Sequence, residues 1–147
     1  MKRIVYKDKI AFNLPDHWVA EEDSGIGVFF EQGEEVSTLR VELLVAKSPK
    51  PVDKNTPFEM LQAISTGDES VEELGNGVFY KTHLSEFVEK DQEIIIHYWY
   101  IANAVNPDIG QLVTFSFTTL SSNRNDPETL QIVGMLDKEI RGSQFID

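Results

Sequence analysis

The segment Glu93–Ala104, which reads Glu-Ile-Ile-Ile-His-Tyr-Trp-Tyr-Ile-Ala-Asn-Ala, decides the fold of this chain. Isoleucine, tyrosine and tryptophan suit a pleated, largely buried surface, and neither glycine nor proline interrupts them. The segment therefore predicts a central β-strand. Similar runs lie on either side of it, Val78–Val88 with an alternating pattern and Leu112–Leu120 rich in valine, phenylalanine and threonine. Together the three runs predict an antiparallel meander.

The positions of the turns set the predicted register of this meander. A turn centred near Asp91 places Leu84 opposite Tyr98, and a second turn at 107–110 places Tyr98 near Phe117. One face of the meander is then the predicted core, with Val78, Tyr80, Leu84, Val88, Ile94, Ile96, Tyr98, Tyr100, Val113, Phe115 and Phe117. The reverse face carries Lys81, His83, Ser85, His97, Trp99, Ser116 and Thr118. A slip of one residue in either hairpin would exchange these faces, because side chains alternate along a strand.

Further strands are predicted before the meander, among them the short run Val28-Phe29-Phe30. Ile4–Tyr6 and Ile10–Leu14 are joined by a polar turn and followed by Pro15, which predicts an edge hairpin. Trp18 comes just after this hairpin and is expected to close one end of the core. Apolar and polar residues alternate in Thr38–Lys47, a pattern typical of a half-exposed antiparallel strand.

Two helices are predicted from their end signals. Thr56-Pro57-Phe58-Glu59 has the spacing of a capping box with proline at the first helical position, and Gly67 supplies the end of this helix. Asp126-Pro127 begins a second helix, which ends at Gly142. The predicted apolar stripe of the second helix consists of Leu130, Val133, Leu136 or Met135, and Ile140. We expect both helices to pack against the sheet in an α+β fold.

Composition excludes several classes of function. A chain of 147 residues fits a single domain, residues 1–147, with a self-sufficient core. The absence of cysteine excludes disulfides, thiolate metal sites and a cysteine nucleophile. A formal net charge of -12 repels a phosphate backbone, so we expect no nucleic-acid partner. Since no apolar run approaches the length of a membrane span, we expect a cytoplasmic protein without membrane insertion.

Two histidines are predicted on the reverse face, where His83 and His97 would approach each other across adjacent strands. Ser85 and Ser116 would lie nearby, and a histidine beside a serine is the minimum for acyl transfer. A catalytic serine also needs oxyanion donors, however, and amides in the middle of a strand are engaged in the sheet. A third metal ligand is not evident, because Glu86 would point to the opposite face. We therefore expect no enzyme activity, no metal ion and no cofactor.

The reverse face remains the candidate surface for a partner or ligand, and its candidate residues are His83, His97, Trp99, Ser116 and Thr118. A broad face with Trp99 exposed favours a protein interface, because tryptophan is a good interface anchor. A deep pocket over the two histidines favours a small ligand or a hydrolase. As a further alternative, the second helix covers Trp99 and makes it part of the core. We expect a non-catalytic, adaptor-like or chaperone-like domain that binds a protein partner, with small-ligand binding or hydrolysis as the alternative.

The order of elements also resembles a known fold. The features that carry the resemblance are Phe12-Asn13-Leu14-Pro15 with Trp18, the long meander strands, a helix in mid-chain, and a C-terminal helix followed by Phe145. These features resemble the Mog1/PsbP-like sandwich, which includes the DcrB-type bacterial proteins and several bacterial domains of unknown function. The resemblance implies an antiparallel sheet with helices packed against it. Known members mostly bind other proteins, so it also implies a protein partner, but no shared motif transfers their binding residues to this chain.

Overall fold

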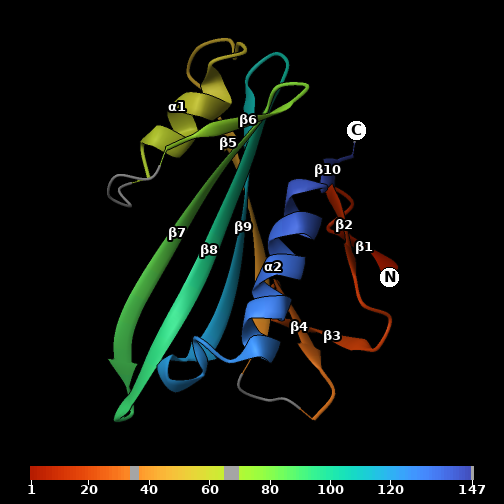
Figure 1. Ribbon diagram of the computed structural model, residues 1–147. Coiled ribbons are helices and arrows are strands. Elements are labelled where there is room, and N and C mark those ends of the chain that lie inside the picture. The colour runs from red at the N-terminus through yellow and green to blue at the C-terminus, as the bar shows by residue number, and fades with distance from the viewer. Residues whose placement is uncertain (34–36, 65–69, 147) are drawn as a thin grey trace.

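The computed structural model describes residues 1–33, 37–64 and 70–146, and within them the chain forms two antiparallel sheets and two helices (Figure 1). The larger sheet has the order β3-β4-β5-β9-β8-β7-β6 and the smaller one the order β1-β2-β10. The strands of the larger sheet are β3 (Trp18–Asp23), β4 (Ile26–Glu31), β5 (Thr38–Lys47), β6 (Glu72–Gly75), β7 (Val78–Glu89), β8 (Gln92–Val105) and β9 (Ile109–Leu120). Those of the smaller sheet are β1 (Lys2–Tyr6), β2 (Ile10–Leu14) and β10 (Gln144–Phe145). The helices are α1 (Thr56–Gln62) and α2 (Pro127–Arg141), and a short 3-10 turn, η1 (Ser121–Asn123), precedes α2.

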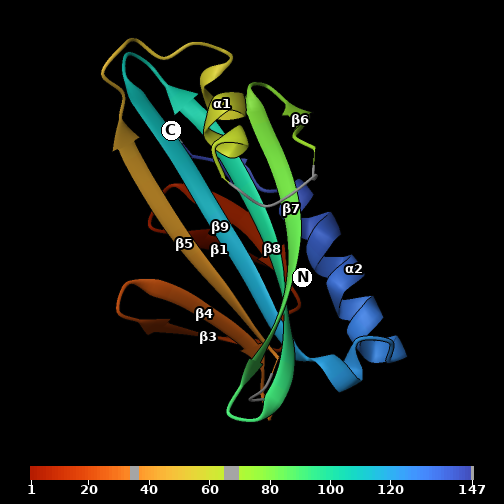
Figure 2. The ribbon, with the colours of Figure 1, turned by 90° about the vertical axis from the view of Figure 1, so that its left-hand side faces the viewer.

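The elements form layers on the seven-stranded sheet. Helix α2 and the smaller sheet cover one face, which we call the core face, whereas α1 covers one end of the other face (Figures 1 and 2). Beyond α1, no helix or strand of the described chain crosses this second face, which we call the open face (Figure 2). The architecture confirms the predicted α+β class. Among the described residues, no helix has the length and apolar character needed to cross a bilayer.

Most of the predicted elements are present. The edge hairpin forms with Ile4 opposite Phe12, and Trp18 is buried and stacked on Phe117 at a centroid distance of 6.5 Å. Helix α2 begins after Asp126 and ends before Gly142, as predicted. Within its predicted stripe, Leu136 and Ile140 are buried in the core and Val133 and Met135 pack against it. Leu130 was wrongly placed in this stripe, because 56% of its surface is exposed.

The predicted capping box of α1 is wrong. The Thr56 hydroxyl does not bond the Glu59 amide but accepts a hydrogen bond from the Asp53 amide at 2.9 Å. The Glu59 amide donates instead to the carbonyl of Asn55, the residue before the helix, at 3.0 Å. A turn from Asp53 to Thr56 therefore already uses the threonine hydroxyl. The predicted helix end at Gly67 lies outside the described residues.

Both hairpins of the meander differ from their predicted register by one residue. Leu84 pairs with His97 instead of Tyr98, and Phe117 likewise pairs with His97. The first turn consists of Lys90 and Asp91, which both have positive φ angles, 50° and 65°. A two-residue turn of this kind matches the natural twist of a hairpin. With this turn, Glu89 pairs with Gln92, so the strand pairing differs by one residue from the pairing that a turn centred on Asp91 would give.

This shift turns β8 over relative to the prediction. The core face carries the odd-numbered residues of β5, β8 and β9 and the even-numbered residues of β7. The predicted core positions Tyr80, Val113, Phe115 and Phe117 are confirmed as buried, and Val78 packs against them. The predicted face of β8 is wrong, since the open face carries Ile94, Ile96, Tyr98 and Tyr100; of these four, Ile94 is nevertheless buried. Leu84 and Val88 have core-face parity but lie beyond the packed region and are exposed.

Candidate functional site

The structure separates the five residues predicted for the reverse face. His83, Ser116 and Thr118 do lie together on the open face, on β7 and β9. His97 and Trp99 lie on the core face beside α2, because the register shift reverses β8. Trp99 is 3% exposed and belongs to the core, which is the alternative in which the second helix covers it. Trp99 therefore cannot be the exposed anchor of an interface.

Aromatic side chains occupy the centre of the open face in place of Trp99. Tyr98 and Tyr100 project from β8 and stack with a centroid distance of 5.9 Å and an interplanar angle of 7°. The His83 ring stacks on Tyr98 from the neighbouring strand at 6.1 Å. All three are half-buried. We call this region the tyrosine surface, and it consists of His83, Ile96, Tyr98, Tyr100, Ser116 and Thr118.

Apolar and charged groups surround the tyrosine surface. Phe87 on β7 and Leu44 on β5 share the open face and are both exposed. Arg40 and Glu42 on β5 are exposed beside Ser116 and Thr114 of β9. The arrangement therefore has an aromatic centre and a mixed polar and apolar margin, which is typical of protein interfaces.

Helix α1 forms one boundary of the tyrosine surface and is firmly fixed there. The Lys81 ammonium is buried beneath the helix and donates to the carbonyls of Leu61 at 3.3 Å and Ile64 at 2.9 Å. A cation suits this position, because the carbonyl end of a helix carries partial negative charge. Beneath α1, a Cβ on Gly110 would lie only 2.8 Å from the Met60 sulfur. A side chain at this position would therefore require the Met60 side chain to move.

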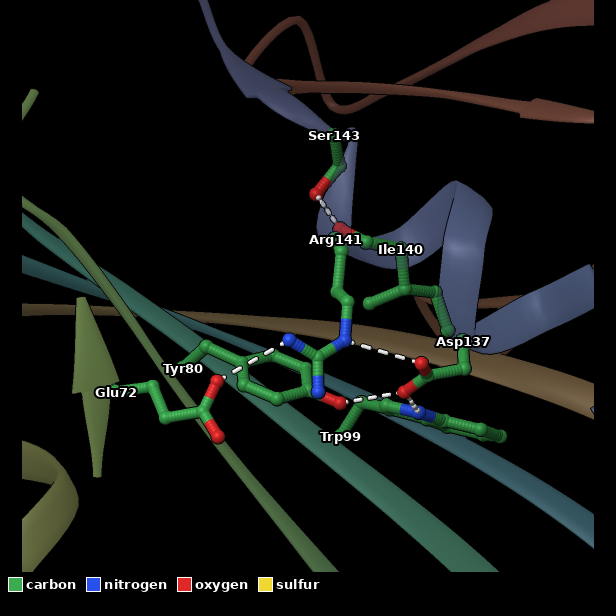
Figure 3. Close-up of polar contacts among 7 residues, drawn as sticks. All are labelled: Glu72, Tyr80, Trp99, Asp137, Ile140, Arg141 and Ser143. Atoms are coloured by element: carbon green, nitrogen blue, oxygen red, sulfur yellow. Dashed lines mark hydrogen bonds and ion pairs between the residues drawn. The ribbon is translucent and has the colours of Figure 1, made fainter. Parts of the chain in front are cut away.

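A polar cluster on the core face joins α2 to the sheet (Figure 3). One Asp137 carboxylate oxygen accepts hydrogen bonds from the Tyr80 hydroxyl at 2.5 Å and from the Trp99 indole N–H at 3.1 Å. The other oxygen accepts from Arg141 Nε at 3.0 Å, and Arg141 also bonds Glu72 at 3.1 Å. The Arg141 guanidinium lies over the Tyr80 ring, 4.3 Å from its centroid. Three strands are thus tied to one turn of α2.

These contacts set the pKa values in the cluster. Burial acts to raise the pKa of Asp137, but the hydrogen bonds from Tyr80, Trp99 and Arg141 outweigh it and lower that pKa below 3.8. Burial and the adjacent Asp137 carboxylate raise the pKa of Tyr80, which therefore remains a neutral donor. Because the pKa of Asp137 is lower in the folded state, its ionisation stabilises the fold above pH 3.8, and this contribution is lost at lower pH.

A recess of about 350 Å³ lies on the core face between the edge of the sheet and α2. Residues that line it include Thr82, Leu84, His97, Trp99, Val133 and Gly134. The His97 ring stacks on Trp99 at 6.1 Å. A Cβ on Gly134 would meet no atom within 4 Å, so the recess extends up to the backbone of α2.

Acidification is expected to destabilise the protein through His97. Burial, together with the charge of Arg124, lowers the pKa of His97 below 6.5. As the pH falls, the imidazole of His97 therefore becomes protonated in the unfolded chain before it does so in the folded protein. The free energy of unfolding then decreases below pH 6.5, by at most about 1.4 kcal/mol per pH unit. Urea denaturation from pH 7.5 to 5 measures this slope. The His97→Gln variant should lack it, whereas His17→Gln, at an exposed site, should retain it; equal slopes in all three proteins would contradict the assignment.

Among the described residues, the Ser85–His83 pair is not accompanied by the oxyanion donors of an acyl-transfer site. Ser85 Oγ lies 3.0 Å from His83 Nε2, a distance compatible with proton transfer. However, Ser85 is in the middle of β7, away from any helix N-terminus or tight turn that would converge N–H donors on an oxyanion. Among the described residues, no group of three histidine or acidic side chains is arranged to hold a metal ion.

Neither the tyrosine surface nor the Asp137 cluster was predicted from the sequence, and the reasons differ. Tyr98 and Tyr100 were assigned to the core because the turn was misplaced by one residue. The run of charged and polar residues Glu89-Lys90-Asp91-Gln92 is the signal that points to a turn at its two central residues. Asp137 lies 38 residues from Trp99 in the sequence, and no local sequence pattern predicts the hydrogen bond between them.

No family model and no curated protein sequence matches this chain, but solved structures do. A crystal structure of a protein from Bacteroides thetaiotaomicron matches with a TM-score of 0.63 and 15% identity, covering 99% of this chain and 48% of that one. The chain thus spans about half the length of this Bacteroides protein. LpqN of Mycobacterium tuberculosis, involved in cell envelope biogenesis, matches with a TM-score of 0.62 and 12% identity, covering 94% and 83% of the two chains. The solution structure of cyanobacterial PsbP (CyanoP) from Synechocystis has a TM-score of 0.45 and 16% identity, covering 98% and 91%.

The predicted antiparallel sheet with helices packed against it is thereby confirmed. The chain shares its α+β fold, with two helices packed on antiparallel sheets, with LpqN and with the Bacteroides protein. At 12% and 15% identity, these matches establish the architecture and leave activity and partners open.

Proposed function

We propose that this protein is a non-catalytic binding module that recognises another protein through its tyrosine surface. The observation that carries the proposal is the stacked pair of Tyr98 and Tyr100, half-buried on a sheet face that α1 covers only at one end. Tyrosines held by stacking lose little side-chain entropy on binding, and they combine apolar area with a hydroxyl. They are therefore suited to be anchors of an interface.

Charge supports a partner of particular character. The chain has 25 acidic residues and 13 lysines and arginines, so a basic partner would be attracted over a distance. The centre of the tyrosine surface is aromatic, so short-range affinity would depend on apolar contact. A partner with an apolar patch inside a basic margin fits both features. Raising the salt concentration should then slow association more than it weakens the final complex.

Replacing both tyrosines is expected to abolish partner capture without unfolding the protein. The test is affinity purification from the source cells, identification of the bound protein, and measurement of Kd with that protein in purified form. Tyr98→Ala and Tyr100→Ala should each cost about 2 kcal/mol or more, which is about thirtyfold in Kd. The matched control is Leu130→Ala, since Leu130 is an exposed apolar residue on α2, away from this face.

Two results would contradict the proposal. In the first, an identified partner binds the tyrosine variants as tightly as it binds the wild type, with all proteins shown to be folded. In the second, no protein is captured, yet the purified chain binds or turns over a small molecule. The second result would favour the ligand-binding alternative, with the recess beside His97 as its first location to examine.

A further inference from the structure

The outer edge of β7 has unpaired backbone groups. On this side, β6 pairs only with Val78, Phe79 and Tyr80. From Leu84 to Glu89, the chain is paired with β8 on one side, and no strand of the described residues pairs with it on the other. Alternate residues of such an edge strand point their N–H and C=O groups outward. This half of β7 can therefore accept another strand.

The edge combines exposed apolar side chains with two glutamates. Leu84, Phe87 and Val88 are 43%, 42% and 65% exposed. Between Leu84 and Glu89 the sequence has no lysine, proline or bulge, and its charged residues are Glu86 and Glu89. The opposite edge of the same sheet, β3, ends in the exposed run 21–23, three acidic residues in succession. The β7 edge therefore offers apolar contact that this end of β3 does not.

Side-chain space exists on both sides of this edge. A strand added beside β7 would direct alternate side chains to the two faces of the sheet. One set would reach the recess bordered by Leu84, with Trp99 and Gly134 among its lining residues. The other set would lie beside Phe87 and continue onto the tyrosine surface. Arg124 bonds Glu86 at 2.7 Å on the core-face side of this edge.

We propose that the edge from Leu84 to Glu89 binds an extended segment of the partner protein by β-strand addition. Main-chain hydrogen bonds would supply affinity, and the recess would select apolar side chains at every second position. Because Glu89 lies at the end of the edge, Glu93 lies beside it on β8, and the whole chain is acidic, the segment carries basic residues beside its apolar ones. This inference rests on the proposed function and defines the class of partner.

A model peptide tests strand addition directly. The probe is fluorescein-labelled Lys-Val-Thr-Val-Thr-Val-Lys-amide, and the control peptide has proline in place of the central valine. Binding of the peptide is followed by its fluorescence anisotropy. Amide hydrogen exchange of the protein, measured with and without the peptide, locates the binding site. We expect the probe to bind and to slow exchange at alternate residues between Leu84 and Glu89, whereas the proline peptide binds at least about tenfold more weakly because it lacks a donor.

Variants separate the edge from the recess. Leu84→Lys introduces a blocking charge on the edge, and Gly134→Leu fills the recess while leaving the edge intact. Each should weaken probe binding by about tenfold. The matched control is Val5→Lys, because Val5 is an exposed apolar residue on β1, an edge strand of the smaller sheet. Gly134→Leu also keeps the test informative if Leu84→Lys fails to fold.

Several outcomes would overturn the inference. These are equal binding of the proline peptide, an effect of Leu84→Lys no larger than that of Val5→Lys, and no probe binding up to about 1 mM. A wild-type dimer that Leu84→Lys dissociates, seen by sedimentation equilibrium, would show that a second copy occupies the edge. If the captured partner requires Tyr98 but tolerates both edge and recess variants, strand addition fails and the proposed function stands. If it requires none of them, both fail.

Discussion

Replacing Phe115 by alanine is expected to lower the free energy of unfolding by about 3–5 kcal/mol. Phe115 is fully buried on β9, with its ring edge-to-face against Phe12 of the smaller sheet at 5.2 Å. Its neighbours across the strands are Val41 and Trp99. Truncation therefore opens a cavity where both sheets meet, and none of these neighbours can move into it without losing other contacts.

The control for Phe115 lies on the same strand and the opposite face. Thr118 is half-buried on the open face, so Thr118→Ala should cost less than about 1 kcal/mol. Urea denaturation followed by tryptophan fluorescence gives both values, provided that the slopes of the transitions agree. Losses of similar size at the two positions would show that the assignment of the faces is incorrect.

Removal of the Asp137 carboxylate is expected to cost about 2–4 kcal/mol, although this side chain is partly exposed. The reason lies in its partners, because Tyr80 and Trp99 are buried and would be left with unsatisfied O–H and N–H groups. Arg141 would also lose the bond that holds it over the Tyr80 ring. Asp137→Ala should therefore loosen α2 as well as lower the midpoint of denaturation.

Two matched variants define the source of this loss. Asp137→Asn retains an oxygen acceptor but no charge, so it should lose about half as much stability as Asp137→Ala. Lys138→Ala, at the next and exposed position of α2, should be nearly neutral. Trp99 fluorescence reports the change around its indole N–H. If Asp137→Ala were no more destabilising than Lys138→Ala, the hydrogen bonds of the cluster would contribute nothing to folding.

Local patterns in the sequence predict most of the elements correctly. The alternation in Thr38–Lys47, the proline after Leu14 and the end signals of α2 each depend on residues close together in the chain. The register of the meander was harder to predict, because β8 is apolar on both of its faces. With Ile94, Ile95 and Ile96 in succession, the hydrophobic pattern fits either register equally well. Only the geometry of the turn distinguishes the two.

The register of β8 also explains why only some of the candidate residues were placed on the correct face. His83, Ser116 and Thr118 were correctly grouped, since β7 and β9 shift together relative to β8. His97 and Trp99 were predicted on the open face, where the structure has Tyr98 and Tyr100 instead. Burial of Lys81 under α1 also had no signal in the sequence, because it depends on carbonyl groups that only the folded helix presents.

The position of β8 between two environments gives the molecule a way to vary its properties separately. Its odd-numbered residues from Ile95 to Ile101 face the side covered by α2, and its even-numbered residues from Ile96 to Tyr100 face outward. Adjacent residues of β8 therefore have different roles, one in the stability of the core and the next on the exposed surface. Under the proposed function, divergence at Tyr98 or Tyr100 would change the partner while the core beneath stays unchanged.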